Sequence, residues 1–567
     1  MLTRLGIKNF KQFDDVTVEL GNPVVFVGPN NSGKTSALQA LALWSLGLRR
    51  WSERWKDREP TTKRTGATIN RNDLFPVPVS TALYLWRDLH VRQSRGRSQS
   101  PNVLMEVLVE GVTGEKRWEF GFEFDYANAE SFYCRPIRAS AELEPSKLKV
   151  PPEAAEITVA FLPPMSGMAD REHVKQRGEI DFLLGQGRTA EVLRNLAYKL
   201  SEGPEGREAW GVITENIDRL FGCKLLPPKV IPERSEIEMH YVQRGQEFDI
   251  ACAGRGLHQT LLLLTFISNN PKSVLLLDEP DAHLEVIRQR QTYELLSEYA
   301  AKHQCQVVIA SHSEVILQEA ADRDVVIGFL GTPRRINDRG TQLQKSLNRI
   351  GWEHYAQVLL RGWVLYLEGS TDLAILRAFA KKLNHPVLAD LEAPYVDYIG
   401  NVPSKARESF YGLRVAKPDL VGLVLCDRLT QPEESAPELQ RHWWKRREIE
   451  NYFCQPATLR AWARAQDPQG EYPLLGTFER CMDESLQGRL GPDVLSNLED
   501  PYWRDTAVSE EFLRPLFRSF YTKLGLQNLI DKKHFHVLVE FVDERDIDDE
   551  VTDVLDMIHS VALAARP

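Results

Sequence analysis

Short apolar runs alternate with helical patterns in two parts of the chain, residues 2–48 and residues 274–310. Residues 2–7 and 24–27 have the pattern of strands, and a helical pattern follows over 36–48. Residues 274–277 and 306–310 are apolar runs that flank a helical pattern from about 285 to 303. Buried strands that alternate with helices predict an α/β fold with parallel strands.

A second α/β pattern begins near residue 363. Apolar strands are expected at 363–367, 395–399 and 421–426, with helical stretches between them and an acidic helical tail from 509 onward. The intervening region is mixed: 103–109 and 118–124 alternate with period two, whereas 189–200 and 208–221 have a helical period. We therefore expect an N-terminal domain over 1–350, with an inserted segment at about 51–250, and a C-terminal domain over 351–567.

Composition indicates a soluble protein with several domains. The chain has 567 residues, 43% hydrophobic and 26% charged, and no apolar run long enough to span a bilayer. The N-terminus lacks an apolar signal core, and the seven cysteines include no C-x-x-C pair. We expect a cytoplasmic protein with reduced thiols and no membrane partner.

The net charge of −10 implies that any nucleic-acid surface is local. The most basic stretch, residues 48–71, contains Trp51 and Trp55, which share a face if the segment is helical. Two interpretations fit this stretch: a helix that packs its tryptophans on the core, which we favour, or direct contact with nucleic acid.

Residues 28–35 match the phosphate-loop pattern G-x-x-x-x-G-K-[ST] between a predicted strand and a predicted helix. Backbone N–H groups of such a loop surround phosphate oxygens, and the helix N-terminus adds partial positive charge. Lys34 is expected to reach the outer phosphates of ATP, and Thr35 to hold Mg²⁺. The nucleotide-binding residues expected here are Gly28, Asn30, Asn31, Ser32, Gly33, Lys34 and Thr35.

Three further motifs downstream suit the chemistry of nucleotide hydrolysis. The strand at 274–277 ends in Asp278, expected to hold Mg²⁺, and Glu279, expected to activate the attacking water. The strand at 306–310 precedes His312, placed to sense the γ-phosphate. Gly254 and Gly256, in the loop 253–259 ahead of an apolar helix over 260–268, are expected to present N–H groups to a phosphate.

These motifs resemble those of the ABC-type ATPases of the RecF/SMC/OLD group. The opening sequence at 5–13 looks like that group's first strand, and 253–259 resembles its signature loop, although Cys252, Ala253 and Arg255 depart from the usual residues. In these ATPases two heads face each other, and the signature loop of one completes the nucleotide site of the other. The resemblance therefore implies a homodimer or higher oligomer through the ATPase heads.

Residues 364–372 resemble the E-G-x-x-D motif of Toprim domains. A buried strand ends in Glu368, and Asp372 follows at the start of a helix; a later strand ends in Asp427. The resemblance implies that these carboxylates hold Mg²⁺ or Mn²⁺ and use the metal to cleave a phosphodiester.

The chain departs from the Toprim pattern where D-x-D is usual. It has Asp427-Arg428-Leu429, so the second carboxylate is missing. Residues 446–452 resemble an R-x-E-I-E-N-Y segment of OLD-type Toprim domains, in which Glu450 is a further metal-ligand candidate. Glu448 and Glu450 would point the same way only on a strand. Lys532 and Lys533 are candidates for an assisting cation.

The sequence is identified as similar to the OLD (overcoming lysogenisation defect) family, whose logic is shared by Gabija-type and PARIS-type antiphage proteins. This implies an ATPase whose nucleotide state gates a metal-dependent nuclease acting on DNA or RNA. Two alternatives fit the same residues. One is a non-nucleolytic ATPase scaffold with a degenerate Toprim domain that holds or releases an effector protein, and the other is a RecF-like repair ATPase.

Overall fold

The chain forms two compact units, residues Met1–Gln344 and Lys345–Pro567, and each has its own sheet core. The computed structural model describes residues 1–55, 66–74, 77–92, 102–137, 150–321, 323–329, 331–336, 357–358, 361–392, 394–414, 417–428, 436–466 and 477–565.

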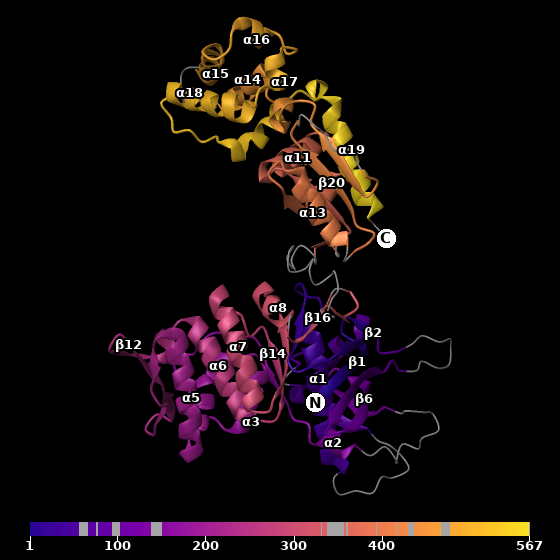
Figure 1. Ribbon diagram of the computed structural model, residues 1–567, viewed down its shortest axis with the longest axis vertical. Helices are drawn as coiled ribbons and strands as arrows, with labels where there is room; N and C mark the ends of the chain where they lie inside the picture. The colour runs from indigo at the N-terminus through magenta and orange to yellow at the C-terminus, as the bar shows by residue number, and fades with distance from the viewer. Residues whose placement is uncertain are drawn as a thin grey trace. The chain divides into compact units, whose positions relative to one another are not determined.

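A parallel sheet forms the centre of the N-terminal unit. Its strands are almost fully buried, as expected for a parallel sheet that helices cover on both faces. Helices α6 and α7 lie side by side against one face (Figure 1). The strand order is β17 (Arg334–Arg335), β16 (Val325–Gly328), β3 (Val24–Val27), β15 (Gln306–Ser311), β14 (Val274–Asp278) and β8 (Val159–Leu162), and only β17 is antiparallel.

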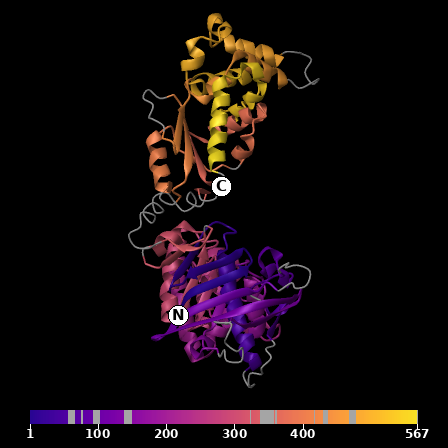
Figure 2. The ribbon, with the colours of Figure 1, turned by 90° about the vertical axis from the view of Figure 1, so that its right-hand side faces the viewer.

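A second, antiparallel sheet packs in the same unit and faces the viewer in Figure 2. Helix α1 lies between the two sheets, which explains why nearly all of its first five turns are buried. The strand order is β2 (Phe13–Glu19), β1 (Leu2–Phe10), β5 (Met105–Thr113), β6 (Lys116–Asn128), β7 (Ser131–Pro136) and β4 (Ala67–Asn70).

The segment expected to be an insertion contributes to both sheets of this unit. Its strands β5 to β7 extend the antiparallel sheet from β1, and β8 forms one edge of the central sheet. Beyond β8 it is mainly helical. The remaining elements of the unit are α1 (Lys34–Trp55), α2 (Pro152–Ala155), α3 (Arg177–Gly185), α4 (Leu193–Ser201), α5 (Gly203–Phe221), α6 (Arg255–Asn269), α7 (Val286–Lys302), α8 (Glu314–Ala321), β9 (Lys224–Leu225), β10 (Lys229–Ile231), β11 (Glu236–Glu238), β12 (His240–Gln243) and β13 (Gln246–Asp249).

Helix α1 extends further than the predicted 36–48. It ends at Trp55, and Trp51 is buried with its ring 5.6 Å from that of Trp55. The tryptophan face therefore packs on the core, as the first interpretation of this stretch states. Residues 56–65 of the basic stretch lie outside the described residues.

The C-terminal unit is built on a four-stranded parallel sheet. Helix α13 covers one face, and α11 and α19 cover the other, as Figure 2 shows for α13 and the yellow α19. The strand order is β19 (Val396–Tyr398), β18 (Trp363–Leu367), β20 (Val421–Cys426) and β21 (Leu439–Trp443). Its helices are α11 (Ser370–Lys382), α12 (Leu388–Glu392), α13 (Pro403–Arg414), α14 (Pro456–Ala465), α15 (Thr477–Gln487), α16 (Pro492–Ser496), α17 (Pro501–Asp505), α18 (Arg514–Leu524) and α19 (Asp549–Ala564).

Candidate functional site

The phosphate loop connects β3 to α1 as the sequence predicts. Gly33 has φ +104°, and a Cβ there would lie 2.7 Å from the Phe13 ring. A side chain at this position would thus be both strained and crowded, which explains the second glycine of the motif. Asn31 also has a positive φ, of 62°, so the loop turns tightly ahead of the helix.

Lys34 and Thr35 occupy the first turn of α1. The Lys34 ammonium donates to the carbonyls of Gly28 (2.7 Å) and Pro29 (2.9 Å), so it is folded back over the loop. The Thr35 hydroxyl donates to the Asp278 carboxylate at 3.0 Å. This bond joins the first turn of α1 to the end of β14, and both oxygens are of the kind that Mg²⁺ prefers.

Asp278, Glu279 and His312 meet at the same edge of the central sheet. Burial raises the pKa of Asp278 to about 6, and the neighbouring Glu279 charge adds to this effect. The Glu279 N–H donates to the Ala310 carbonyl (2.8 Å), and its carboxylate lies 3.4 Å from Nδ1 of the half-exposed His312. The three side chains predicted from separate motifs are therefore neighbours.

A hollow of about 320 Å³ lies over the loop, large enough for a phosphate group and its ion. It is lined by Gln12, Asn30, Asn31, Ser32, Gly33, Lys34, Thr35, Ser36 and Glu279. Gln12 was not among the predicted site residues. It comes from the turn between β1 and β2 and donates to the Asn31 carbonyl at 3.2 Å. Only the fold brings Gln12 to the loop, so no local sequence pattern marks it as a site residue.

The loop 253–259 departs from its predicted form. Helix α6 begins at Arg255 rather than at 260, so Gly254 is its N-cap and Gly256 lies in its first turn. The Gly254 backbone is exposed, and no side chain caps the helix. Neither glycine lines the hollow over the phosphate loop of its own chain.

In the C-terminal unit, Glu368 follows β18 and Asp372 lies in the first turn of α11. The Asp372 carboxylate, at the third residue of α11, reaches back and accepts from the N–H groups of Glu368 (3.1 Å) and of the N-cap residue Gly369 (3.3 Å). Burial, together with the Glu368 charge, raises its pKa to about 6.

Asp427 follows β20, the strand next to β18. Burial raises its pKa well above the ordinary range, and the Glu368 charge and a hydrogen bond with that carboxyl add to the effect. Asp427 and Glu368 are therefore close neighbours at the carboxyl ends of adjacent strands.

Most polar residues of the R-x-E-I-E-N-Y segment form hydrogen bonds or ion pairs that hold the fold together. Arg446 forms an ion pair with Asp548 (2.9 Å), Tyr452 donates to Glu550, and Glu448 accepts from the Ser509 N–H. Asn451 donates to the Trp503 carbonyl at 2.8 Å. These bonds hold the segment, a 3₁₀ turn at Ile449–Tyr452 and not a strand, against the C-terminal helices.

Glu450 is buried, and its Oε1 has no hydrogen-bond partner among the described residues. Burial raises its pKa to about 8, Glu448 and Asp372 add to this, and Lys532 opposes it. Burial lowers the pKa of Lys532, but the charges of Glu450, Glu448 and Glu368 outweigh this and raise it. Glu450 and Lys532 thus face the same group of acids.

Arg428 does not face the acids with its guanidinium. It pairs with Asp505 at 2.7 Å and donates to the Lys445 carbonyl, while Leu429 lies outside the described residues. In the described part of the chain, no three His, Cys, Asp or Glu side chains are close enough to hold a metal ion as they stand.

Models of known protein families match two segments of the N-terminal unit. Residues 1–47 match an "AAA ATPase domain", and residues 194–318 match an "AAA domain, putative AbiEii toxin, Type IV TA system". The first contains the phosphate loop, and the second contains Asp278, Glu279 and His312. The N-terminal unit is therefore an ATPase domain of the AAA/ABC type.

Known proteins similar to this chain include ATP-binding subunits of transporters. The dipeptide transport ATP-binding protein DppD of Haemophilus influenzae is 31% identical over 122 residues, which are 22% of this chain and 35% of that protein. The hemin import ATP-binding protein HmuV of Vibrio anguillarum is 29% identical over 102 residues, 16% of this chain and 39% of that protein. The chain spans well under half the length of either relative.

Solved structures similar to this chain include the SMC head domain from Thermotoga maritima. It has 15% identity and a TM-score of 0.31, and the match covers 60% of this chain and 99% of that one. The Smc head domain bound to the C-terminal domain of ScpA derived from Pyrococcus furiosus has 15% identity and a TM-score of 0.35, and the match covers 62% of this chain and 99% of that one.

Among the described residues, none of the helices has the length and apolar character that crossing a bilayer requires.

Proposed function

We propose that this protein binds and hydrolyses ATP with its N-terminal unit and that its nucleotide state gates metal-dependent cleavage of DNA or RNA by its C-terminal unit, in antiphage defence. The observation that carries the nuclease is the set of acids at the carboxyl ends of β18 and β20. Glu368 and Asp372 come from the turn between β18 and α11, Asp427 follows β20, and Glu450 adds a buried oxygen that has no hydrogen-bond partner among the described residues.

The residues of the N-terminal unit suit ATP hydrolysis. Thr35 and Asp278 would hold Mg²⁺, and Lys34 would leave the loop carbonyls for the phosphates when the nucleotide enters. Glu279 would orient and deprotonate the attacking water, while His312, 3.4 Å from it, would sense the γ-phosphate and hold the carboxylate in place.

The C-terminal acids suit Mg²⁺ or Mn²⁺. Their ligand atoms are all carboxylate oxygens. A buried oxygen without a hydrogen-bond partner is costly, and a bound metal would supply the partner that Oε1 of Glu450 lacks among the described residues. A bound metal would position the phosphodiester, activate water and neutralise charge on the leaving oxygen. Lys532 would add a fixed positive charge beside Glu450.

Parallel assays of ATP hydrolysis and cleavage test this proposal. Purified wild type, Lys34→Ala and Glu368→Ala are incubated with plasmid, linear DNA and tRNA, with Mg²⁺ or Mn²⁺, with and without ATP. We expect Lys34→Ala to abolish ATP turnover, and Glu368→Ala to abolish cleavage while ATP turnover stays within about twofold of wild type. If Glu368→Ala still cleaves nucleic acid, the C-terminal acids are not the site of cleavage.

One observation favours the second candidate, an ATPase scaffold that sequesters an effector protein without cutting. The chain lacks the second acid of D-x-D, and the described acids do not stand ready around a metal. This function predicts that none of the three nucleic acids is cut by wild type under any of these conditions. A RecF-like repair ATPase predicts in addition that DNA stimulates ATP turnover and that Glu368→Ala has no effect on that stimulation.

A further inference from the structure

Strand β8 is an open edge of the central sheet of the ATPase domain. Among the strands that the structure describes, it pairs only with β14, in parallel, and has none on its other side. The Thr158 carbonyl accepts from the Val274 N–H at 2.8 Å, and alternate residues of a parallel ladder bond to the same neighbour. The N–H and C=O groups of Val159 and Phe161 therefore point away from β14, and no described residue bonds to them.

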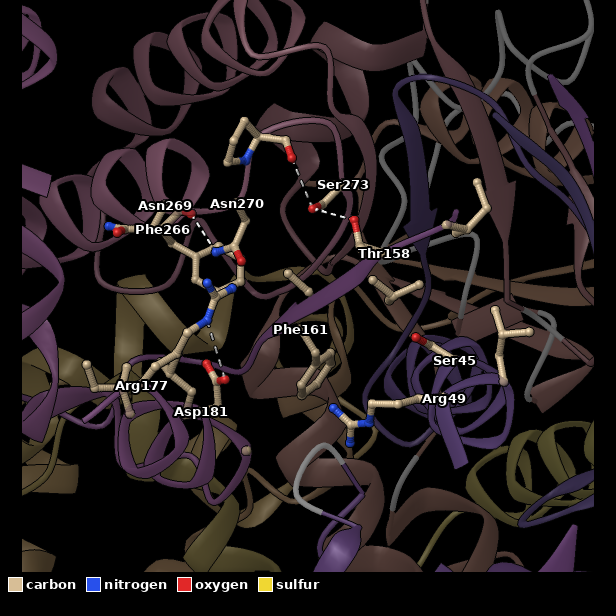
Figure 3. A pocket seen from close by; sticks show the side chains of 18 of the residues that line it. Ser45, Arg49, Thr158, Phe161, Arg177, Asp181, Phe266, Asn269, Asn270 and Ser273 are labelled. Carbon is tan, nitrogen blue, oxygen red and sulfur yellow. Dashed lines mark hydrogen bonds and ion pairs between the residues drawn. The ribbon is translucent and has the colours of Figure 1, made fainter. Parts of the chain in front are cut away.

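A hollow of about 860 Å³ runs along this open edge. Helix α1 forms one wall with Leu48 and Arg49, and α3 forms the other with Ile180 and Asp181. Figure 3 shows Arg49 and Phe161 directed into the hollow, with Arg177 and Asp181 on the opposite wall. A strand edge that runs between two helices is the geometry in which an extended peptide adds to a sheet.

The hollow carries uncompensated positive charge. Both of its carboxylates have partners, because Asp181 lies 4.0 Å from Arg177 and Glu53 lies 3.1 Å from Arg50. The exposed Arg49 and Lys199 have no ion-pair partner among the described residues. The lining has three cations (Arg49, Arg177 and Lys199) and two carboxylates (Glu53 and Asp181), and this net positive charge beside an apolar floor favours an acidic segment as the occupant.

We propose that an extended, acidic peptide segment of a partner protein binds here by adding as a strand to β8. Its backbone would bond to Val159 and Phe161, its alternate apolar side chains would face the hollow beside Leu48 and Ile180, and its carboxylates would meet Arg49 and Lys199. This site is separate from the nucleotide loop, and the proposal does not depend on nuclease activity of the C-terminal unit.

Selection of phage-displayed random heptapeptides on the full-length protein tests the proposal. We expect enriched sequences that alternate β-branched or aromatic residues with Asp or Glu. A synthetic enriched peptide, measured by fluorescence anisotropy, should bind roughly fivefold to tenfold more weakly to Arg49→Glu. The matched control, Lys224→Glu, reverses an exposed cation on β9 outside the hollow and should bind the peptide as wild type does.

Two further measurements distinguish strand addition from simple charge attraction. Phe161→Pro removes an N–H that points away from β14, so it should weaken the peptide roughly tenfold while ATP binding at the phosphate loop is kept. Should that variant fail to fold, hydrogen exchange in wild type decides, since the Val159 and Phe161 amides should become protected when the peptide is added.

Three results would overturn the proposal. They are a selection that enriches nothing, an enriched peptide that protects no amide of 159–161, and displacement of the peptide by ADP in the Lys34→Ala protein. The last of these would make the hollow a small-molecule site.

Discussion

At the scale of single residues, the R-x-E-I-E-N-Y segment shows how a motif can combine structure and chemistry. The two glutamates are two positions apart, but Glu448 accepts a backbone N–H from Ser509, whereas Oε1 of Glu450 has no hydrogen-bond partner in the described part of the chain. The motif alone does not distinguish them. Their hydrogen bonds do, and they predict different outcomes when each is replaced.

We expect Glu448→Ala to destabilise the protein and Glu450→Gln to leave it at least as stable as wild type. The first leaves a buried N–H without an acceptor, which costs about 1–3 kcal/mol, or roughly 2–4 °C in Tm per kcal/mol. The second replaces a buried carboxyl by a neutral group of the same shape. Calorimetry gives both values; an equal loss of Tm in the two variants would contradict the difference in hydrogen bonding between Glu448 and Glu450.

Metal binding to the C-terminal acids should release protons. The pKa of Glu450 is raised to about 8 and that of Asp427 is raised further from its ordinary value, so both are largely protonated at pH 7 in the metal-free protein. Because a metal binds the carboxylate form, its affinity should rise with pH from 7 to about 9, by up to about tenfold per unit for each proton displaced. Titration calorimetry with Mn²⁺ in two buffers of different ionisation enthalpy measures the release, and Glu450→Gln should reduce it.

At the scale of elements, one glutamine joins the two sheets of the ATPase domain. The Gln306 side chain, at the start of β15, accepts from the Leu2 N–H (2.7 Å) and donates to the carbonyls of Leu2 (2.7 Å) and Gly21 (2.9 Å). All of these groups are buried. The packing of β1 beside the central sheet therefore depends on the Gln306 side chain. In the sequence, this residue is only a polar exception at the start of an apolar strand.

We expect Gln306→Leu to lower the free energy of unfolding of the N-terminal unit by about 2–4 kcal/mol, because it leaves three buried backbone groups without partners. Denaturant unfolding of the purified protein measures the change. Gln246→Leu, at an exposed position on β13, is the matched control and should change stability by less than about 0.5 kcal/mol. Equal effects of the two substitutions would show that the Gln306 bonds contribute nothing.

At the scale of the whole molecule, the ATPase domain presents surfaces that its own chain does not use. The first turn of α6 has no side-chain cap, and Val286 and Ile287, just after the acidic turn at 278–285, are 66% and 71% exposed. Exposed apolar residues beside a hydrolysis site are typical of an interface. We infer that ATP brings two ATPase domains together, with Gly254 and Gly256 of one facing the nucleotide of the other.

We expect Glu279→Gln, which slows hydrolysis, to form dimers in ATP and not in ADP. Adding Gly254→Glu should prevent them, because a carboxylate would stand where the partner's phosphates bind. A Cβ at Gly254 meets nothing within 4 Å, so the monomer should fold, and the same holds for the control Gly211→Glu on α5. Light scattering after gel filtration measures the mass; dimers of the Gly254→Glu form would contradict the inferred interface.

By itself the sequence determined those parts of the protein in which a short local pattern, an apolar strand followed by polar residues, marks a candidate site. The phosphate loop, Asp278, Glu279 and His312 were predicted from apolar strands that end in polar residues, and the structure makes them neighbours because parallel strands end at the same edge of a sheet. The acids after β18 and β20 follow from the same rule.

Tertiary structure alone decided which groups are paired and which are free. It placed Gln12 at the phosphate loop, began α6 at Arg255 and gave Arg428 a partner in Asp505. It left Oε1 of Glu450 and the outer edge of β8 without a partner among the residues that the structure describes. Such pairings join segments far apart in the chain, and their energies depend on distance and burial, which no local pattern of residues encodes.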